Sequence, residues 1–429
     1  MYWWSSLASN PSHTLFLLIL LLLPVQLGKH FWPAFATVSG LRIDFLAPTL
    51  YFTDILIILF CAFSLKEFPW RFFRSPLFGM IIFFALVNLI FSIEPLNTII
   101  GIIRFSEYGL FSYLSAHLLS KKGMLRKSLR VLLLAAIWIS ALAFVQFFLQ
   151  KSVGGWLYFL GERSFSAQTP GIANASLSGS LVLRPYATFP HPNVLGGFLT
   201  AVITVAIYWG LHPYLQKKVI NKTALFILGA VFLSLMALLL SMSRSAIVAF
   251  FLVLIFYVLR MKTLRIHILT GGIILLLVSA LVLILFGLSP RFLELKMTDE
   301  SVISRFTQIN QAMSIIDSYP LFGVGLQNYL IQLGKIESRY QILQPVHNVF
   351  FLVWSEMGIV GVLSMVIFLV RLFKRIKDSP SLVREGKFAL FFLIIFLGMF
   401  DHYLYTLHQG RILLSLLIAF MLSRFSLKG

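Results

Sequence analysis

A succession of long apolar segments constrains this chain more than any other feature of its sequence. A helix needs about 20 predominantly apolar residues to cross the hydrocarbon core of a bilayer, and the sequence predicts about twelve such helices. We place them near residues 13–27, 46–65, 77–93, 98–119, 128–149, 193–211, 223–241, 245–260, 266–288, 346–370, 387–404 and 411–427. The predicted fold is therefore an all-α polytopic integral membrane protein, with residues 1–429 forming a single membrane domain.

Composition excludes the main alternatives to a membrane protein. Hydrophobic residues make up 59% of the chain and charged residues only 12%, against about 25% charged residues in soluble proteins. The single cysteine, Cys61, lies in an apolar run and excludes a disulfide scaffold.

The net charge of +20 predicts an orientation in the membrane and does not indicate a nucleic-acid partner. When the N-terminus is placed in the cytoplasm, the inner connections carry most of the Lys and Arg residues, as cytoplasmic loops do. The short outer connections carry only Lys29, Arg42, Arg244 and Arg411. Both termini are then cytoplasmic, and no nucleic acid is expected as a partner.

Two outer segments are long enough to be candidates for function. The first, 150–192, is rich in Gly, Ser and Ala and is predicted to be irregular. The second, 289–345, is predicted to contain an amphipathic helix at the outer membrane surface, because apolar residues recur at helical spacing over 302–316. Arg305 and Gln308 would lie on the polar side of this helix, and Pro320 would end it.

Three polar side chains on the predicted outer face are the strongest candidates for chemistry: Arg184, Arg244 and His347. A guanidinium stays charged and offers a planar fork of donors that fits phosphate oxygens. His347 would lie at a helix start, where the helix dipole favours a neutral imidazole that can act as a general base. The alternative for each residue is structural, with the arginines as interfacial anchors and the histidine bonding backbone.

Weaker candidates stand beside these three. Arg305 is a possible third phosphate contact, His191 is a reserve base in a turn between two prolines, and Asp44 is an alternative base in the first outer loop. No metal site is predicted, because the sequence has no Asp-x-Asp pair, no His-x-x-x-His pair and no cysteine cluster. Inside the bilayer, Arg104 and Glu107 are spaced to pair on one helix face.

Several short blocks resemble the bacterial O-antigen ligase family. His347-Asn348, followed after nine residues by Gly358-Ile359-Val360-Gly361, resembles the signature of that family. Further similar blocks, in family order over roughly residues 180–370, are Arg184 to Asn193 with Gly196-Gly197, Ser243-Arg244-Ser245, and Tyr319 to Gly325.

This resemblance implies a glycosyltransferase of the C-type membrane superfamily in the bacterial cytoplasmic (inner) membrane, with its active site on the outer, periplasmic face. The implied donor is a glycan on undecaprenyl pyrophosphate, and the implied acceptor is a glycolipid or glycan hydroxyl among the membrane lipids. A histidine that matches His347 deprotonates this hydroxyl, and arginines that match Arg184 and Arg244 hold the pyrophosphate. Asn193 and Asn348 are expected to support the site. The implied reaction inverts the anomeric centre and needs no metal or other cofactor.

The resemblance leaves the acceptor open. Ligases use lipid A core, related polymerases extend another lipid-linked glycan, and related O-oligosaccharyltransferases modify a protein. The chain ends soon after its last apolar segment, which disfavours the protein-modifying branch. A transporter or flippase of lipid-linked glycan is the rival from another class, because twelve spans are common in transporters. The long outer loops and the short 211–223 connection argue against it. A non-catalytic scaffold would leave the arginines and His347 unexplained.

Overall fold

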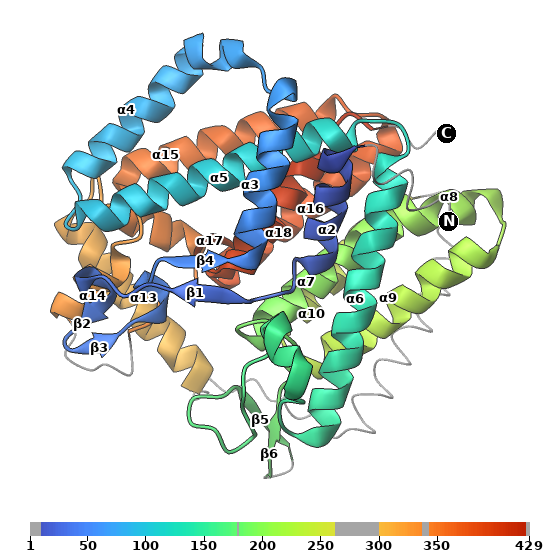
Figure 1. Ribbon diagram of the computed structural model, residues 1–429, viewed down its shortest axis with the longest axis horizontal. Helices are drawn as coiled ribbons and strands as arrows, with labels where there is room; N and C mark the ends of the chain where they lie inside the picture. Colours follow the sequence, from blue (N-terminus) through green and yellow to red (C-terminus); the bar gives the residue numbers. More distant parts are fainter. Residues whose placement is uncertain (1–9, 178–179, 262–299, 337–342, 426–429) are drawn as a thin grey trace.

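The computed structural model describes residues 10–177, 180–261, 300–336 and 343–425, and it is mainly helical (Figure 1). By length and apolar composition, four of its helices could cross a membrane: Met124–Leu149, Pro192–Lys217, Lys222–Leu240 and Val349–Lys377. These helices are consistent with the predicted helical membrane protein. The predicted span at 266–288 lies outside the described residues, so the number of twelve spans stays a prediction.

The helices, in chain order, are α2 (Pro11–Leu22), α3 (Phe52–Ser64), α4 (Pro76–Ile90), α5 (Pro95–Leu119), α6 (Met124–Leu149), α7 (Pro192–Val205), α8 (His212–Lys217), α9 (Lys222–Leu240), α10 (Arg244–Arg260), α13 (Glu300–Ser318), α14 (Tyr329–Ile336), α15 (Val349–Lys377), α16 (Ser381–Phe400), α17 (Tyr403–Thr406) and α18 (His408–Leu422). A π-helical segment, Ala206–Leu211, joins α7 to α8. Short antiparallel pairs are formed by β1 (Gly28–His30) with β4 (Thr49–Tyr51), β2 (Thr37–Val38) with β3 (Leu41–Arg42), and β5 (Asn174–Leu177) with β6 (Ser180–Leu183).

Helix α7 lies at the centre of the helical packing, in contact with α9, α10 and α16. In the most apolar stretch of the continuous helix Pro192–Lys217, which begins with α7, 94% of the residues are buried, against 28% in α15, which turns much of its surface outward. The Gly196-Gly197 pair allows this close packing. A Cβ on Gly197 would lie 1.9 Å from the Tyr403 hydroxyl, and one on Gly196 would lie 2.9 Å from the Cβ of Ala246.

Helix α15 is broken at Gly358, where φ is +66°. The turn before α14 inserts into this break. The amides of Val324 and Gly325 donate to the carbonyls of Ser355 and Glu356, at 3.0 and 2.9 Å. A Cβ on Gly358 would lie 2.1 Å from the carbonyl oxygen of Leu321, so only glycine fits. The two glycine-containing blocks, Tyr319 to Gly325 and Gly358 to Gly361, therefore pack against each other.

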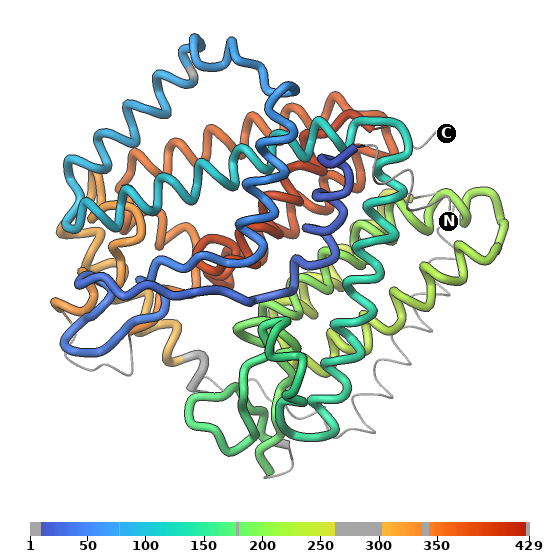
Figure 2. Tube along the Cα trace, in the orientation of Figure 1, coloured from blue at the N-terminus to red at the C-terminus, as the bar shows by residue number. Residues whose placement is uncertain are grey.

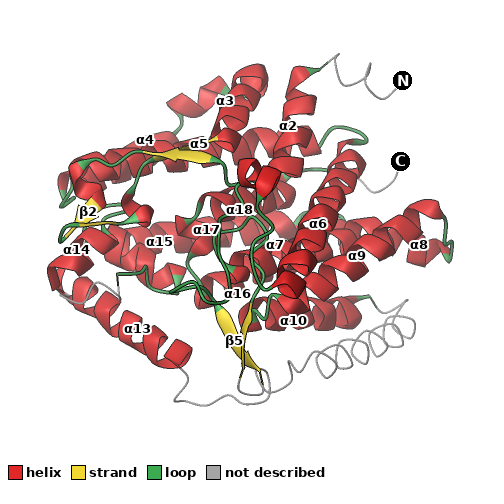
Figure 3. Ribbon diagram, turned by 60° about the horizontal axis from the view of Figure 1, so that its bottom comes forward, coloured by secondary structure: helices red, strands yellow, loops and turns green. Residues whose placement is uncertain are grey.

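Two sequence-based boundaries and one prediction of irregular structure are corrected by the structure. The segment predicted from residue 46 becomes helical only at Phe52, because the residues before it form β4 and a 3-10 turn. The segment predicted through 404 ends at Phe400, and α17 follows it. The 150–192 segment, predicted to be irregular, contains the β5–β6 hairpin, which projects from the helices (Figure 3).

The extended segment that contains β1 to β4 crosses the molecule to reach α13 and α14, as its blue trace shows (Figure 2). Ala36, Val38 and Leu46 are buried there in one apolar cluster with residues of α13, α14 and α15.

Helix α13 is present over the predicted range, but its buried face differs in part from the predicted stripe. Phe306 is 56% exposed, whereas Gln308 on the predicted polar side is only 2% exposed. Gln308 thus belongs to the same buried helix face as Ala312 and Ile315. The helix therefore directs a polar side chain inward.

Candidate functional site

The ends of several helices converge on one site. Arg184 directly follows β6, Asn193 lies in the first turn of α7, Arg244 begins α10, and His347 precedes α15. Asp401 follows the last residue of α16. The site is thus built at helix ends, most of them N-termini, where exposed backbone N–H groups favour anions.

His347 is held by a buried side chain of α13. Its Nδ1 lies 2.7 Å from Oε1 of Gln308, and its backbone N–H donates to the same oxygen at 3.3 Å. Because a backbone N–H can only donate, the Gln308 atom that faces His347 is the carbonyl oxygen. Nδ1 must then carry the proton, and Nε2 of the neutral ring keeps its lone pair. This tautomer is the one a general base at Nε2 requires.

Asp401 and His402 lie beside His347. The rings of His347 and His402 meet edge to face at 4.9 Å between centroids. Oδ1 of Asp401 accepts from the backbone N–H of His402 at 2.8 Å, and His402 Nδ1 pairs with Thr406 at 2.6 Å. A buried carboxylate is therefore available to stabilise a protonated His347.

Asn193 connects Asp401 to Arg184. Its Nδ2 donates to Oδ2 of Asp401, and its Oδ1 accepts from Nη2 of Arg184, both at 2.8 Å. Arg184 also donates from Nε to the carbonyl of Ser241 at the end of α9, at 2.9 Å. These hydrogen bonds give Arg184 structural contacts, and its buried guanidinium also lines a cavity.

That cavity, which we call the arginine cavity, has a volume of about 420 Å³. It brings together most of the side chains that the sequence singled out, and it is lined by Arg184, His191, Asn193, Met242, Arg244, Ser245, Val248, Ser304, Arg305, Gln344, His347, Phe396 and Phe400. The turn before Arg244 is held by Met242, which has φ +49°. Such left-handed conformations in residues other than glycine cluster at functional sites. Three guanidinium groups and an imidazole facing one space can bind a pyrophosphate.

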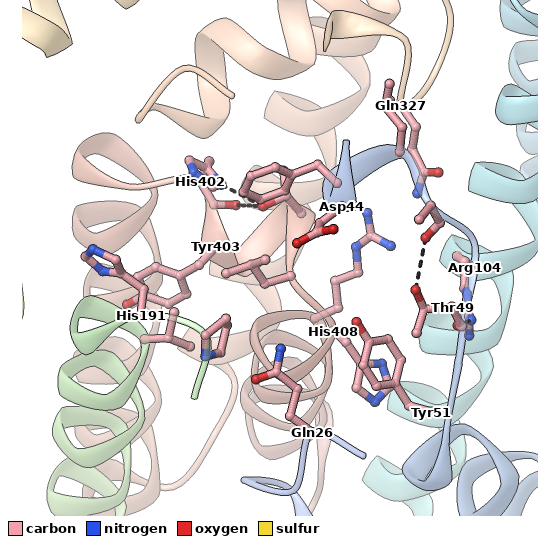
Figure 4. A pocket seen from close by; sticks show the side chains of 18 of the residues that line it. Gln26, Asp44, Thr49, Tyr51, Arg104, His191, Gln327, His402, Tyr403 and His408 are labelled. Carbon is pink, nitrogen blue, oxygen red and sulfur yellow. Dashed lines mark hydrogen bonds between the residues drawn. The ribbon is translucent and has the colours of Figure 1, made fainter. Parts of the chain in front are cut away.

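A second cavity, which we call the polar cavity, shares His191, Gln344 and His347 with the arginine cavity. Its lining includes Asp44, Arg104, Tyr108, His347, Asp401 and Arg411. Figure 4 shows His191, His402 and Tyr403 on one side of it and Thr49, Tyr51 and Arg104 on the other. Asp44 lines this cavity from an exposed position.

The remaining candidates have structural contacts. His191 caps α7, because its Nδ1 accepts from the backbone N–H of Asn193 at 3.1 Å. Asn348 caps α15 by accepting from Phe350 and Phe351, at 2.9 and 3.1 Å, and its Nδ2 donates to the carbonyl of Met399. His191 therefore uses one ring nitrogen for the cap, and Asn348 supports His347 through the backbone.

The pKa directions separate the three histidines. Burial lowers the pKa of His347, and Arg305 lowers it further, whereas Asp401 raises it. Burial lowers the pKa of His191 and of His402 to about 3. Burial alone would raise the pKa of Asp401, but the neighbouring histidines and the amide of Asn193 hold it below its usual value. At neutral pH the site thus holds neutral imidazoles beside an ionised carboxylate.

The fold also brings together a possible set of metal ligands that sequence spacing does not reveal. His347, Asp401 and His402 each place one ligand atom within 4.8 Å of the others. One ring nitrogen of each histidine and a carboxylate oxygen could therefore hold an ion. The sequence-based argument against metal ligands therefore does not extend to the folded chain.

Sequence reasoning did not select Gln308, Asp401 or His402 for the site. The adjacent Asp401-His402 pair near the end of an apolar segment was the available signal, since ionisable residues at such positions are costly without a role. Gln308 carried no signal of its own, because a polar residue on an amphipathic helix is normally exposed.

Comparison with known proteins confirms the resemblance drawn from the sequence. Residues 229–366 match the family model described as O-antigen ligase. The matched range contains Arg244, Arg305 and His347, whereas Arg184 and Asp401 lie outside it. No curated protein sequence matches the chain. The family match and the apolar helices together indicate an integral membrane protein with a glycosyltransferase-like function.

Proposed function

We propose, from the match of residues 229–366 to the O-antigen ligase family, that this chain is a membrane glycosyltransferase. It moves a glycan from undecaprenyl pyrophosphate to an acceptor hydroxyl on lipid A core or a similar surface acceptor. The reaction takes place at the outer, periplasmic face of the bacterial inner membrane.

His347 acts as the general base. The acceptor oxygen forms a bond to the anomeric carbon of the donor while the bond from that carbon to the pyrophosphate oxygen breaks. The pyrophosphate leaves with the bonding electron pair, the anomeric centre inverts, and the acceptor proton passes to Nε2 of His347. Asp401 is a positioning residue, because its negative charge stabilises the imidazolium that forms.

The arginines of the arginine cavity stabilise the leaving group. Charge develops on the pyrophosphate as the bond breaks, and guanidinium groups already directed at that position lower the barrier. Arg184 is held in place by hydrogen bonds to the Ser241 carbonyl and to Asn193. Arg244 and Arg305 approach the same space from α10 and α13.

One observation carries this proposal. A histidine held in the tautomer that leaves Nε2 as an acceptor opens on a cavity lined by three arginines. A transporter needs neither the tautomer nor the cluster. The polymerase alternative uses the same site, and only the acceptor separates it from a ligase.

The test uses purified protein in lipid vesicles with an undecaprenyl-pyrophosphate glycan, with and without a lipid A core acceptor. A ligase releases undecaprenyl pyrophosphate only with the acceptor, and His347→Ala abolishes release while insertion into the membrane is unchanged. Longer glycans on the undecaprenyl carrier, without any added acceptor, would identify a polymerase. An absence of turnover with every acceptor would favour a transporter.

Two further measurements test the roles of the arginines and of a metal. Arg244→Ala should weaken donor use strongly, and Arg244→Lys should restore it only in part, since lysine lacks the planar fork. Full activity of Arg244→Ala would remove this residue from the phosphate site. Chelation should leave turnover unchanged, whereas a loss that added metal restores would make His347 a metal ligand.

A further inference from the structure

A short 3-10 helix, η5 (Gly155–Leu160), presents large aromatic side chains outward, and none of its residues is buried. Trp156, Tyr158 and Phe159 are 86%, 62% and 57% exposed. The sequence between Lys151 and Glu162 contains no charged residue. Exposed apolar side chains that gather in this way mark a surface that contacts a membrane or a partner. We call these three side chains the aromatic patch.

The position of η5 favours a lipid surface as the occupant. It follows α6, one of the helices long and apolar enough to cross a membrane, after a short connection. It also packs against the chain just beyond α2. The Leu160 carbonyl accepts from the backbone N–H of Gln26 at 3.3 Å, and a Cβ on Gly161 would lie 2.6 Å from the Gln26 nitrogen. Thus η5 lies beside the ends of two apolar helices, where a bilayer surface is expected.

The exposed side of α6 supports the same occupant. Leu134, Ala141, Val145 and Phe148 are exposed at helical spacing, and this apolar stripe reaches the last turn of the helix. Such a stripe on a membrane-spanning helix faces hydrocarbon. Trp and Tyr are enriched where hydrocarbon meets water, because their rings are apolar and carry one polar group. The aromatic patch follows the stripe along the chain, as residues at the bilayer surface would.

A buried carboxylate holds the base of η5. Glu162 accepts from the backbone N–H groups of Val153 and Gly154, at 2.8 and 2.7 Å, and from the side chain of Gln146 at 2.7 Å. Gly154 has a φ of +79°, which glycine adopts without strain, and this allows both N–H groups to face the carboxylate. The fold therefore directs the aromatic patch outward from a fixed base.

Gln146 connects this base to the chain that follows Arg184. Its Oε1 accepts from the backbone N–H groups of Tyr186 and Ala187, at 3.0 and 2.7 Å, and its Nε2 donates to the Ala187 carbonyl at 2.9 Å. The same Nε2 donates to Glu162. A contact that fixes the height of η5 therefore also bears on the height of the Arg184 segment.

We propose that the aromatic patch inserts into the headgroup region of the lipid leaflet on the side of the active site, and that it anchors the Arg184 segment to this surface. The anchoring role rests on the proposed function, in which Arg184 binds a pyrophosphate attached to a lipid of this leaflet. The anchor then keeps Arg184 at the depth of the donor pyrophosphate.

The first test measures the depth of η5 and needs no turnover. A nitroxide is attached to Tyr158→Cys in the full-length protein, with the buried native thiol removed by Cys61→Ala. The protein is placed in vesicles of phosphatidylcholine and phosphatidylglycerol. Electron paramagnetic resonance then compares collisions of the nitroxide with oxygen, which concentrates in lipid, and with a nickel chelate, which stays in water.

Two labelled control sites bracket the expected result. Leu134→Cys lies in the exposed stripe of α6 and should show the high oxygen-to-nickel ratio of hydrocarbon. Ser176→Cys lies at an exposed position of the projecting β5–β6 hairpin and should show the low ratio of water (Figure 3). The ratio at Tyr158→Cys should lie between these two values.

Three outcomes would overturn the lipid contact. A ratio equal to that of Ser176→Cys would mean that the aromatic patch faces water. A label that collides with neither reagent would mean that a protein partner or a second copy covers the patch. Protection from nickel that appears only when an undecaprenyl-pyrophosphate glycan is added would identify a glycan-binding surface instead.

The second test separates anchoring from folding. Combined Trp156→Ser and Phe159→Ser should leave thermal stability unchanged, because both side chains are exposed. Transfer from an undecaprenyl-pyrophosphate glycan in vesicles should fall on the order of tenfold, as expected when partly buried aromatic side chains are lost. Transfer from a water-soluble donor with a short prenyl chain should not change. Leu181→Ser, at a similarly exposed apolar residue of β6, is the matched control and should affect neither donor.

An equal fall with both donors would indicate a structural defect and overturn the anchoring role. Unchanged transfer from the undecaprenyl donor would overturn it as well. If the native protein transfers no glycan while the Tyr158→Cys label lies at the bilayer surface, the proposed function is contradicted and the lipid contact stands.

Discussion

Replacing Gln308 tests whether the site depends on one tautomer of His347. Gln308 is 2% exposed and offers a single oxygen to both Nδ1 and the backbone N–H of His347. Gln308→Leu keeps similar volume but removes this acceptor. The ring is then free to place its proton on Nε2, where it cannot accept the proton of the acceptor hydroxyl.

The magnitude follows from the bond that is lost. As His347 takes up a proton, its Nδ1–H bond to Gln308 becomes a bond to a charged group, worth about 1.5–3 kcal/mol. Each increase of about 1.4 kcal/mol in the activation free energy lowers the rate constant tenfold. We therefore expect kcat to fall roughly 10- to 150-fold in Gln308→Leu. The acceptor KM should change little, because this contact strengthens only as charge forms.

Gln308→Glu separates the hydrogen bond from the charge. The carboxylate still accepts from Nδ1, so kcat should stay near the native value, but its negative charge raises the pKa of His347. Since only the neutral ring is active, the acid limb of the kcat–pH profile should move to higher pH. The assay is release of undecaprenyl pyrophosphate in vesicles, measured across pH.

The control is Asn310→Leu, which removes an amide from an exposed position of the same helix. It should leave kcat unchanged. A native kcat in Gln308→Leu, with the protein folded and inserted, would refute the assignment of the tautomer.

The other predictions concern the charges around His347 and the break in α15. Burial and Arg305 lower the pKa of His347, whereas Asp401 raises it. We therefore expect Arg305→Gln to move the acid limb of the kcat–pH profile to higher pH and Asp401→Asn to move it to lower pH. Shifts of both variants in the same direction would contradict this electrostatic explanation. Gly358→Ala should destabilise the fold by at least about 1–3 kcal/mol, since alanine meets both a strained φ and the Leu321 carbonyl. Thermal unfolding in detergent measures this, with Gly79→Ala at an open helical glycine as the control; equal stability of the two variants would show that the break does not need glycine.

The sequence predicted the helical segments well because each must be apolar over most of its length. Helices α6, α9 and α10 follow the predicted ranges to within a few residues. The errors fall where backbone hydrogen bonding changes within an apolar run, as at Phe52 and Asp401. Hydropathy does not report that change.

The main candidates were also selected from the sequence, and the side of the membrane on which they lie stays a prediction. Alternation of spans brought Arg184, Arg244 and His347 to one face, and the structure gathers all three around the arginine cavity. Arg305, a weaker candidate, lies there too, whereas Asp44 lines the neighbouring polar cavity. The catalytic roles of these residues stay predictions.

By itself, then, the sequence predicted the class of fold, the candidate residues for phosphate binding and proton transfer, and the resemblance to the O-antigen ligase family that residues 229–366 confirm. These properties depend on local hydropathy and on side-chain chemistry, which the order of residues contains directly. Only the tertiary structure decided which nitrogen of His347 is left as an acceptor, which carboxylate faces it, and how η5 is connected to the segment that carries Arg184. These features depend on contacts between residues far apart in the sequence. Gln308 and His347 are 39 positions apart, and Tyr108 and His408 are 300 positions apart. Packing alone sets such contacts, because no local pattern in the chain encodes them.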